Sequence, residues 1–257
     1  AEIIMSINKN NEIIPAHIWT PWFSLFGSMS GFDSIQECFG DQTKHIHAIE
    51  TGLSSDPSMN WRLSQLDNVQ LVSFSDAHSF WPWKIGRECT VFDCKKLSYN
   101  EILHGIRTGE GLVESVEFFP EEGKYHYDGH RNCKVVMDPQ TSLKNNNICP
   151  KCKRSLTIGV AHRVEKLADR PVGFKPKNAK PFINLIPLSE LIGGSIGKGV
   201  ATKSVFEIYY KLIKQFGNEF NILLEASLDS LKPYCNEKLL EYIKMNREQK
   251  IKFNPGY

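Results

Sequence analysis

The sequence predicts an α/β fold with a metal-binding module and a helical C-terminal extension. Through the first 119 residues, apolar runs of strand length alternate with helix signals. Residues 120–183 are polar and rich in turn formers, yet they hold closely spaced His and Cys residues. From residue 184 onward, apolar side chains recur at helical spacing. We therefore expect three parts, at residues 1–119, 120–183 and 184–257.

The elements of the first part follow from their apolar patterns and their start and stop signals. Strands are expected at EIIPAHIW (12–19), HIHAIE (45–50), NVQLVSF (68–74) and LVESVEFF (112–119). Helices are expected at residues 33–40, 54–67 and 97–111. Ser34 with Glu37, and Ser98 with Glu101, have the spacing of a capping box, and Asp56 can cap the helix between them.

The third part shows one apolar stripe, formed by Val205, Ile208, Tyr209, Leu212, Ile213 and Phe216. A final helix is expected after Asn236.

Composition restricts the class of protein. The 257 residues are 41% hydrophobic and carry a formal net charge of +2, which is typical of a globular chain. The sequence shows neither an apolar run of about 20 residues nor a signal-peptide pattern at its start, so a cytoplasmic location without a membrane partner is expected. Seven cysteines, an odd number, favour reduced thiols and a metal over a disulfide framework.

Two short motifs predict a structural zinc site. His130 and Cys133 are separated by two residues, as are Cys149 and Cys152, and fifteen residues lie between the pairs. Two such pairs can surround one Zn²⁺ tetrahedrally and leave no position open for substrate. His126 and His162 are competing choices for the histidine ligand, and spacing favours His130.

A second set of residues indicates metal-dependent hydrolysis. Asp76 and His78 follow directly after an expected strand, and His17 and Glu50 lie at or near the ends of two others. The ends of the strands are where α/β barrels gather their chemistry, and carboxylate and imidazole groups can bind divalent ions there. An Asp followed by a turn can equally be a helix cap, and a single His can be a core residue.

Other polar and aromatic residues are weaker candidates. His45 and His47 point to one face of an expected strand while Glu50 points to the other, so a structural role is expected for them. Residues 144–180 hold ten Lys and Arg residues against only Glu165 and Asp169, a strip that can attract phosphates. Tryptophans flank the candidate ligands and can belong to the core or to a wall that stacks on a base: Trp19, Trp22, Trp81 and Trp83.

Several long segments together resemble the endonuclease Q group of the PHP (polymerase and histidinol phosphatase) superfamily. These are IIPAHIWTPWFSLFGSMSGFDSI, AIETGLSSDPSMNWRLSQLD, VSFSDAHSFWPWKIGRE, EFFPEEGKYHYDGHRNC and CPKCKRSLTIGVAHRVEKLADRP. The resemblance runs from about residue 12 to Tyr257. It implies a distorted (β/α)₇ PHP barrel with a zinc-binding insertion and a helical C-terminal extension. It also implies an enzyme, a metal-dependent endodeoxyribonuclease that nicks DNA 5′ of uracil, hypoxanthine, xanthine and abasic sites.

The resemblance also implies roles for individual residues. His17, Asp76 and His78 become ligands of a divalent metal cluster of Zn²⁺, Mg²⁺ or Mn²⁺, with Glu50 beside it. His130, Cys133, Cys149 and Cys152 become the ligands of the structural zinc. We expect the pocket for the damaged nucleotide to be bordered by Ser54, Ser55, Trp19, Trp22, Trp81 and Trp83.

One departure from the family pattern affects what this chain can do. The family places a strand with His-x-His upstream of the PAH segment, and residues 1–14 contain no such strand. We therefore expect the chain to be the C-terminal portion of such an enzyme, with an N-terminal barrel segment as its partner in cis or in trans. The alternatives are a PHP phosphoesterase for small phosphomonoesters, or a catalytically incomplete fragment that binds DNA or another chain.

Overall fold

The computed structural model describes residues 1–257, which fold into two compact units. The first unit contains residues 1–74, 88–183 and 254–257. The second contains residues 75–87 and 184–253. The structure thus divides the chain close to the expected boundary at residue 184, but it assigns the 75–87 segment to the C-terminal part. It does not separate residues 120–183 from residues 1–119 as a compact unit of their own.

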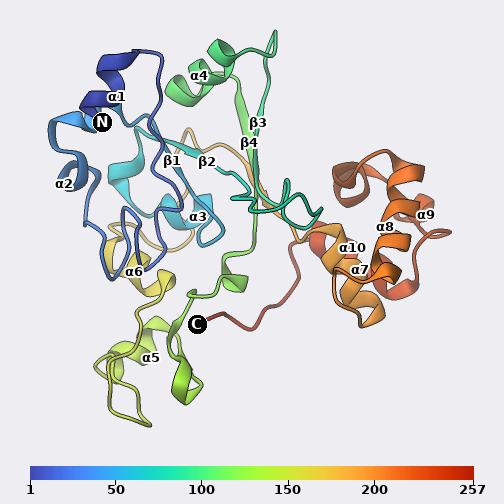
Figure 1. The fold of residues 1–257 in the computed structure, drawn as a ribbon. Helices are drawn as coiled ribbons and strands as arrows, with labels where there is room; N and C mark the ends of the chain where they lie inside the picture. The colour runs from blue at the N-terminus through green and yellow to red at the C-terminus, as the bar shows by residue number, and fades with distance from the viewer. The chain divides into compact units, whose positions relative to one another are not determined.

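The strands of the first unit form small sheets instead of one continuous sheet. Two short parallel strands, β1 (Ala48–Glu50) and β2 (Gln70–Val72), pair with each other. A second sheet has the order β3-β4-β7, from Cys89–Phe92, Leu112–Glu117 and Phe182–Asn184. A third is the antiparallel pair of β5 (Asp128–His130) and β6 (Val135–Met137). Figure 1 shows β3 and β4 running alongside each other, with α4 near one end. The mixed α/β class is confirmed, whereas a partial barrel stays an expectation from the resemblance.

The helices of the first unit are short. They are α1 (Glu2–Ile7), α2 (Ile35–Phe39), α3 (Pro57–Asn60), α4 (Tyr99–Thr108), α5 (Pro139–Lys144) and α6 (Val160–Leu167). Single 3₁₀ turns cover Gly40–His45, Ser64–Leu66, Pro120–Glu122 and Arg131–Cys133.

All three predicted capping residues begin helices, and Asp56 accepts the backbone N–H of Met59 at 3.0 Å. The Ser34 hydroxyl accepts the backbone N–H of Glu37 at 3.0 Å, and Ser98 does the same for Glu101 at 3.3 Å.

Two predictions for the first unit are wrong in detail. The expected strand at residues 12–19 is not a regular strand, although it bonds to β1 through Glu50 N to Pro15 O at 3.0 Å and Ile18 N to Glu50 O at 3.3 Å. The expected helix at 54–67 is broken into α3 and the 3₁₀ turn Ser64–Leu66. The sequence reasoning also missed β3 entirely.

The second unit is a group of helices, which Figure 1 shows gathered together. They are α7 (Leu188–Ile196), α8 (Lys203–Phe216), the π-helical turn Asn221–Glu225, α9 (Leu228–Leu231) and α10 (Glu237–Arg247). The predicted stripe of α8 is buried at Val205, Tyr209 and Leu212. The predicted final helix is confirmed as α10, whose N-cap Asn236 accepts the N–H of Leu239 at 2.7 Å. None of these or the other helices has the length and apolar character needed to cross a bilayer.

Candidate functional sites

Four predicted ligands of a structural metal lie together in the first unit. The ligand atoms of His130, Cys133, Cys149 and Cys152 are all within 4.8 Å of one another. The Cys152 sulfur lies 3.8 Å from each ring nitrogen of His130. One nitrogen and three sulfur donors match the ligand set that tetrahedral Zn²⁺ prefers in structural sites. The residues therefore fit the implied group, and spacing alone was enough to find them.

Two tight turns of the backbone bring these ligands together. The first turn connects β5 to β6 and carries His130 and Cys133, and Lys134 completes it with a φ of +48°. In the second turn, Cys149 N donates to Arg154 O at 2.8 Å and Lys153 N donates to Cys149 O at 2.9 Å.

The pKa values of the thiols depend on the same turns. Desolvation raises the pKa of the Cys133 thiol to about 11. Desolvation also acts on Cys149, but the backbone N–H groups of Cys152 and Lys151 outweigh it and lower the pKa of that thiol. Backbone amides that stabilise one thiolate are typical of a cysteine prepared to ligate a cation.

The two competing histidines lie outside this cluster. His162 Nδ1 is 2.5 Å from the buried carboxylate of Asp128, which also accepts Gly159 N–H at 2.7 Å. His126 is buried, its Nδ1 has no hydrogen-bond partner, and desolvation lowers its pKa to about 4. The structure thus favours His130 as the nitrogen ligand.

Part of the basic strip supports the fold. Arg163 is buried and donates to the carbonyl oxygens of Phe26 and Phe32 at 2.9 Å and to Asp33 at 2.7 Å. Arg170 is bonded through both terminal nitrogens to the carboxylate of Asp67. These two cations are therefore paired within the protein. The strip thus has fewer free cations that could bind phosphates.

The structure brings His17 and Glu50 together near the end of β1. The backbone N–H of His17 donates to Glu50 Oε2 at 2.7 Å, and the His17 ring lies 3.3 Å from the Ser24 hydroxyl. His17 takes a φ of +33°, and a Cβ on Gly52 would lie only 2.6 Å from its Cα. A glycine at residue 52 is therefore needed for this close approach. Glu50 thus positions the backbone of His17, and a metal at this point stays a prediction.

Sequence reasoning missed a buried pair of acidic residues, Glu88 and Glu117, which bind the chain just after β1. Glu88 accepts the backbone N–H of Leu53 at 2.9 Å and that of Phe118 at 3.2 Å. Glu117 accepts hydroxyl hydrogen bonds from Thr51, Ser73 and Ser115 at 2.8, 3.0 and 2.5 Å. Desolvation, followed by the charge of Glu88, raises the pKa of Glu117 well above 4.5. Thr51 and Ser73 follow β1 and β2 directly, so Glu117 connects the ends of these two strands.

Asp76 and His78 lie in the second unit, on the 75–87 segment. Their side chains are 49% and 85% exposed. His78 Nδ1 is 2.8 Å from the Asp76 carbonyl oxygen and 3.8 Å from Asp76 Oδ1, while Asp76 has a φ of +45°. The two side chains thus approach each other and face solvent. His17 and Glu50 belong to the first unit, so one metal site shared by all four residues stays a prediction.

Several residues expected to contact substrate are core residues. Trp19 has no exposed surface, and its indole N–H donates to Asn60 Oδ1 at 2.8 Å. Ser55 is also fully buried and bonds to the Thr51 carbonyl at 2.9 Å. A side chain without accessible surface cannot stack on a base, so the expected substrate contact is wrong for these two residues in this conformation. Trp22, in contrast, is partly exposed and packs edge-on against Tyr125 with 5.3 Å between ring centroids.

Trp81 and Trp83 stack on each other within the second unit. Their ring planes are 3° apart, with 5.3 Å between centroids. Trp83 is only 9% exposed, whereas Trp81 is 39% exposed. Trp83 therefore packs against one face of the Trp81 ring, and its burial argues against direct contact between Trp83 and a base.

His47, one of the two other histidines considered above, has a structural partner. His47 Nδ1 lies 2.8 Å from Glu12 Oε1, and the other oxygen of Glu12 accepts Arg107 Nε–H at 2.6 Å. This arrangement agrees with the structural role expected for His47.

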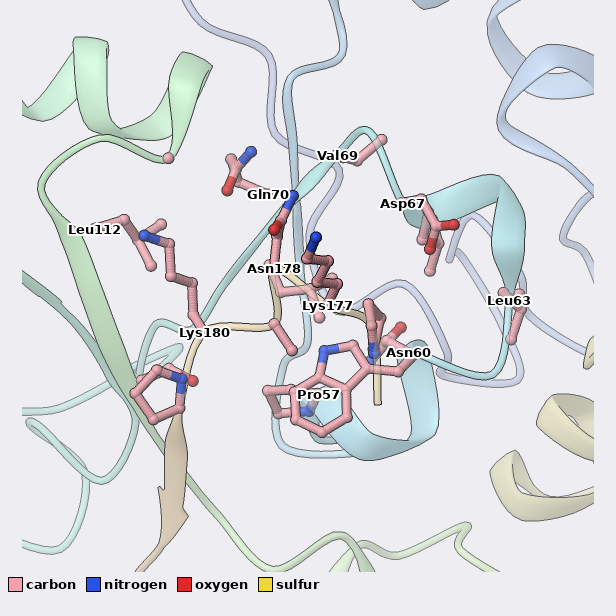
Figure 2. Close-up of a pocket in the computed structure, with 18 of the residues that line it drawn as sticks. Pro57, Asn60, Leu63, Asp67, Val69, Gln70, Leu112, Lys177, Asn178 and Lys180 are labelled. Atoms are coloured by element: carbon pink, nitrogen blue, oxygen red, sulfur yellow. The ribbon is translucent and has the colours of Figure 1, made fainter. Parts of the chain in front are cut away.

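A pocket of the first unit is separate from the predicted chemistry. It has a volume of about 640 Å³ and lies between α3, the start of β2, the start of β4 and the segment before β7. In Figure 2 the labelled side chains of Gln70, Lys177 and Asn178 gather in its middle. His17 and Glu50 do not line it. Two lysines, Lys177 and Lys180, and two acidic residues, Asp67 and Glu110, line this pocket, and none of the expected metal ligands does.

Comparisons with known proteins give this geometry a context. A family model, the MJ0043 C-terminal domain, matches residues 187–250, which include α7 to α10. Protein MJ0043 of Methanocaldococcus jannaschii is 35% identical over 243 residues, which cover 93% of this chain and 30% of that protein. Protein YqxK of Bacillus subtilis is 30% identical over 246 residues, which cover 95% of this chain and 58% of that protein.

Two solved structures share the fold. The lesion-specific endonuclease PfuEndoQ from Pyrococcus furiosus matches with a TM-score of 0.85 and 32% identity, over 95% of this chain and 60% of that one. An endonuclease Q in complex with a 27-mer duplex, with an abasic lesion at its active site, matches with a TM-score of 0.87 and 31% identity, over 99% and 63%. The resemblance to the endonuclease Q group is confirmed. The chain spans less than two thirds of each of these four proteins.

Proposed function

We propose that this chain is the C-terminal portion of a metal-dependent endodeoxyribonuclease of DNA repair. The proposal rests above all on the likeness to an endonuclease Q bound to duplex DNA with an abasic lesion at its active site, which extends over 99% of this chain. The substrates are duplexes with uracil, hypoxanthine, xanthine or an abasic site, nicked on the 5′ side of the lesion. An N-terminal barrel segment with the His-x-His strand completes the site, in cis or in trans.

Each candidate residue has a task in this reaction. His17, Asp76 and His78 hold divalent ions, and Glu50 fixes the backbone of His17 through its 2.7 Å hydrogen bond. Bound divalent ions supply the Lewis acid and the activated water that phosphodiester hydrolysis needs. The exposed side chains of Asp76 and His78 leave room for a phosphate group to approach them.

The metal at His130, Cys133, Cys149 and Cys152 has a structural task. Residues 120–159 have only a small core of Val135, Cys149 and Leu156, which Cys133 and Met137 extend. Binding of Zn²⁺ by four protein ligands supplies the free energy that such a small core lacks. Four protein ligands also leave no coordination position for water or substrate.

Selectivity follows from the cost of removing a nucleotide from the duplex. Deaminated bases and abasic sites pair poorly, so extrusion of such a nucleotide costs less than extrusion of a normal one. Trp22 and Trp81 are the predicted tryptophans with enough exposed surface to contact the extruded nucleotide or the gap that it leaves.

A nicking assay tests the proposal. The chain alone, and the chain joined to an N-terminal PHP barrel segment, are incubated with labelled duplexes that contain uracil or hypoxanthine, with Mg²⁺ or Mn²⁺. We expect the joined protein to cut the labelled strand 5′ of the lesion and His78→Ala to abolish the cut. His104→Ala is the matched control, because His104 is exposed and pairs with Glu110 at 2.9 Å on α4 and the turn after it. No cut by the joined protein would remove the endonuclease assignment, and hydrolysis of a small phosphomonoester instead would favour the phosphoesterase.

A further inference from the structure

Five aromatic rings form a continuous ladder within the second unit. Phe80 lies 4.7 Å from Trp81 between ring centroids, and Trp81 stacks on Trp83. Phe206 of α8 contacts Trp81 and Trp83 at 5.7 and 5.8 Å, and Tyr210, one turn further along α8, stacks on Phe206 at 5.9 Å with 18° between planes. Sequence reasoning singled out only the two tryptophans, because Phe206 and Tyr210 are more than 120 residues away in sequence from Trp81.

The middle of the ladder is buried, and the rings at its two ends are exposed to solvent. Trp83 is buried, while Phe80 at one end is 75% exposed and Tyr210 at the other is 59% exposed. Contacts with the neighbouring rings restrict the orientations of each exposed ring, since aromatic contacts of this geometry are favourable. Exposed rings that are fixed before binding lose little conformational entropy when a flat partner stacks on them.

The charges around the ladder favour an anionic partner. Within the second unit, Lys84 and Arg87 follow Trp83 on the same segment, near enough to Glu190 of α7 for their charges to act on it. On α8, Lys203 and Lys214 add positive charge, while Lys211 lies over the Tyr234 ring at 5.6 Å. Glu207 is the single acidic residue of α8 and lies 3.8 Å from Lys203. Flat aromatic surfaces among cations are typical of proteins that bind unpaired nucleic acid, where bases stack on the rings and cations meet the phosphates.

The position of Phe80 along the chain connects the ladder to the proposed chemistry. Phe80 is two residues after His78, and two residues of chain span at most about 7 Å. A base on Phe80 would therefore keep its own phosphates near the candidate metal ligands. Three rings of the ladder, Phe80, Trp81 and Trp83, share the 75–87 segment with the exposed Asp76–His78 pair.

We propose that the five-ring ladder is a stacking platform for unpaired DNA bases next to the phosphate that is cut. The occupant is a single-stranded or extruded nucleotide, and Phe80 and Tyr210 are the rings that touch it. This inference rests on the proposed nuclease function and adds to it the residues that hold the bases.

The test measures binding without cleavage. A fluorescein-labelled single-stranded oligothymidylate is titrated with the full 257-residue chain, without added Mg²⁺ or Mn²⁺, at several salt concentrations. We expect Phe80→Ala with Tyr210→Ala to weaken binding about tenfold or more, because stacking contributes strongly for each base. The slope of affinity against salt should not change, because no cation is removed. Phe80→Tyr should bind as the wild type does, and Phe80→Leu should not.

Controls separate this outcome from damage to the fold and from failure of the nuclease assignment. Phe220→Ala removes another partly exposed ring of the same unit and should bind as the wild type does. Three outcomes would each overturn the inference. They are wild-type affinity of the double variant, absence of DNA binding by the wild type, and wild-type affinity of Phe80→Leu. If the ladder variants bind weakly but the joined wild-type protein cuts no duplex, the proposed reaction fails while the platform remains.

Discussion

The buried carboxyl group of Glu117 should keep its proton to a higher pH than a free glutamic acid does, and Glu117→Gln tests this. Glutamine keeps the shape of the protonated side chain and removes only its ability to ionise. Glu117 Oε2 accepts from the Thr51 and Ser73 hydroxyls, and these hydroxyls also lie 3.2 and 3.1 Å from the carbonyl oxygens of Val72 and Val116. A glutamine NH₂ in the place of Oε2 can donate to both hydroxyls, and each hydroxyl can then donate to its carbonyl oxygen.

The magnitude follows from these contacts. Glu117→Gln should change the free energy of unfolding by less than about 1 kcal/mol at acidic pH, because all three hydrogen bonds are kept. Glu117→Ala removes three bonds of about 1 kcal/mol each and leaves a cavity, so a loss of about 3 kcal/mol or more is expected.

The direction of the pH dependence follows from the raised pKa of Glu117. A carboxyl group that binds its proton more tightly in the folded state stabilises the fold fully at a pH below its unfolded pKa. That contribution is lost as the pH rises from about 4.5 toward the folded pKa. The wild type should therefore become less stable relative to Glu117→Gln as the pH increases.

Urea unfolding between about pH 5 and pH 9, followed by tryptophan fluorescence, measures the difference. Glu114→Gln is the matched control, because it makes the same chemical change on β4 outside the hydroxyl cluster. If the wild-type and Glu117→Gln curves stay parallel across this range, Glu117 is ionised in the folded protein and the reasoning is refuted.

Three further predictions concern the rest of the first unit. Cys149→Ser should remove tightly bound metal and lower the melting temperature, as metal analysis and calorimetry would show; an unchanged zinc content would contradict the assigned ligands. Asp128→Ala should lower the free energy of unfolding by about 3–5 kcal/mol, because it leaves His162 buried without its partner. Asp128→Asn should lower it less, as urea unfolding would show. Equal losses for the two variants would speak against the pairing. Gly109→Ala should lower the free energy of unfolding by about 1 kcal/mol in the same assay. Residue 109 has a φ of +76°, and a Cβ there would lie 2.6 Å from Gln70 Oε1. An unchanged free energy of unfolding would show that the turn adapts.

Features determined by near neighbours in sequence were predictable. The caps at Ser98 and Asn236 depend on residues three positions away, and the structure has both. The four metal ligands depend on two turns with a fixed spacing, and they too lie together. The acidic pair is different, because Glu88 and Glu117 meet partners 30 to 66 residues away, and no local pattern reports such contacts.

The mistaken elements have local physical causes that propensity does not reveal. Pro15 has no backbone N–H to donate, and the positive φ of His17 interrupts an extended chain, so residues 12–19 make only isolated bonds to β1. The Asn60 side chain donates to the Asp56 carbonyl at 2.8 Å and competes with the backbone for it, and Leu63 is extended. The helix expected at 54–67 therefore stops after α3.

The route of the chain has a consequence for genetic dissection. The polypeptide passes from one compact unit to the other four times, after residues 74, 87, 183 and 253. Neither unit can therefore be isolated by a single truncation. A protein cut before residue 184 would leave Trp81 and Trp83 without Phe206, and the helices expressed alone would lack the 75–87 segment that covers part of α8. A stop codon or a protease cut between the units should thus yield fragments prone to aggregation, even where each fragment keeps most of its own helices and strands.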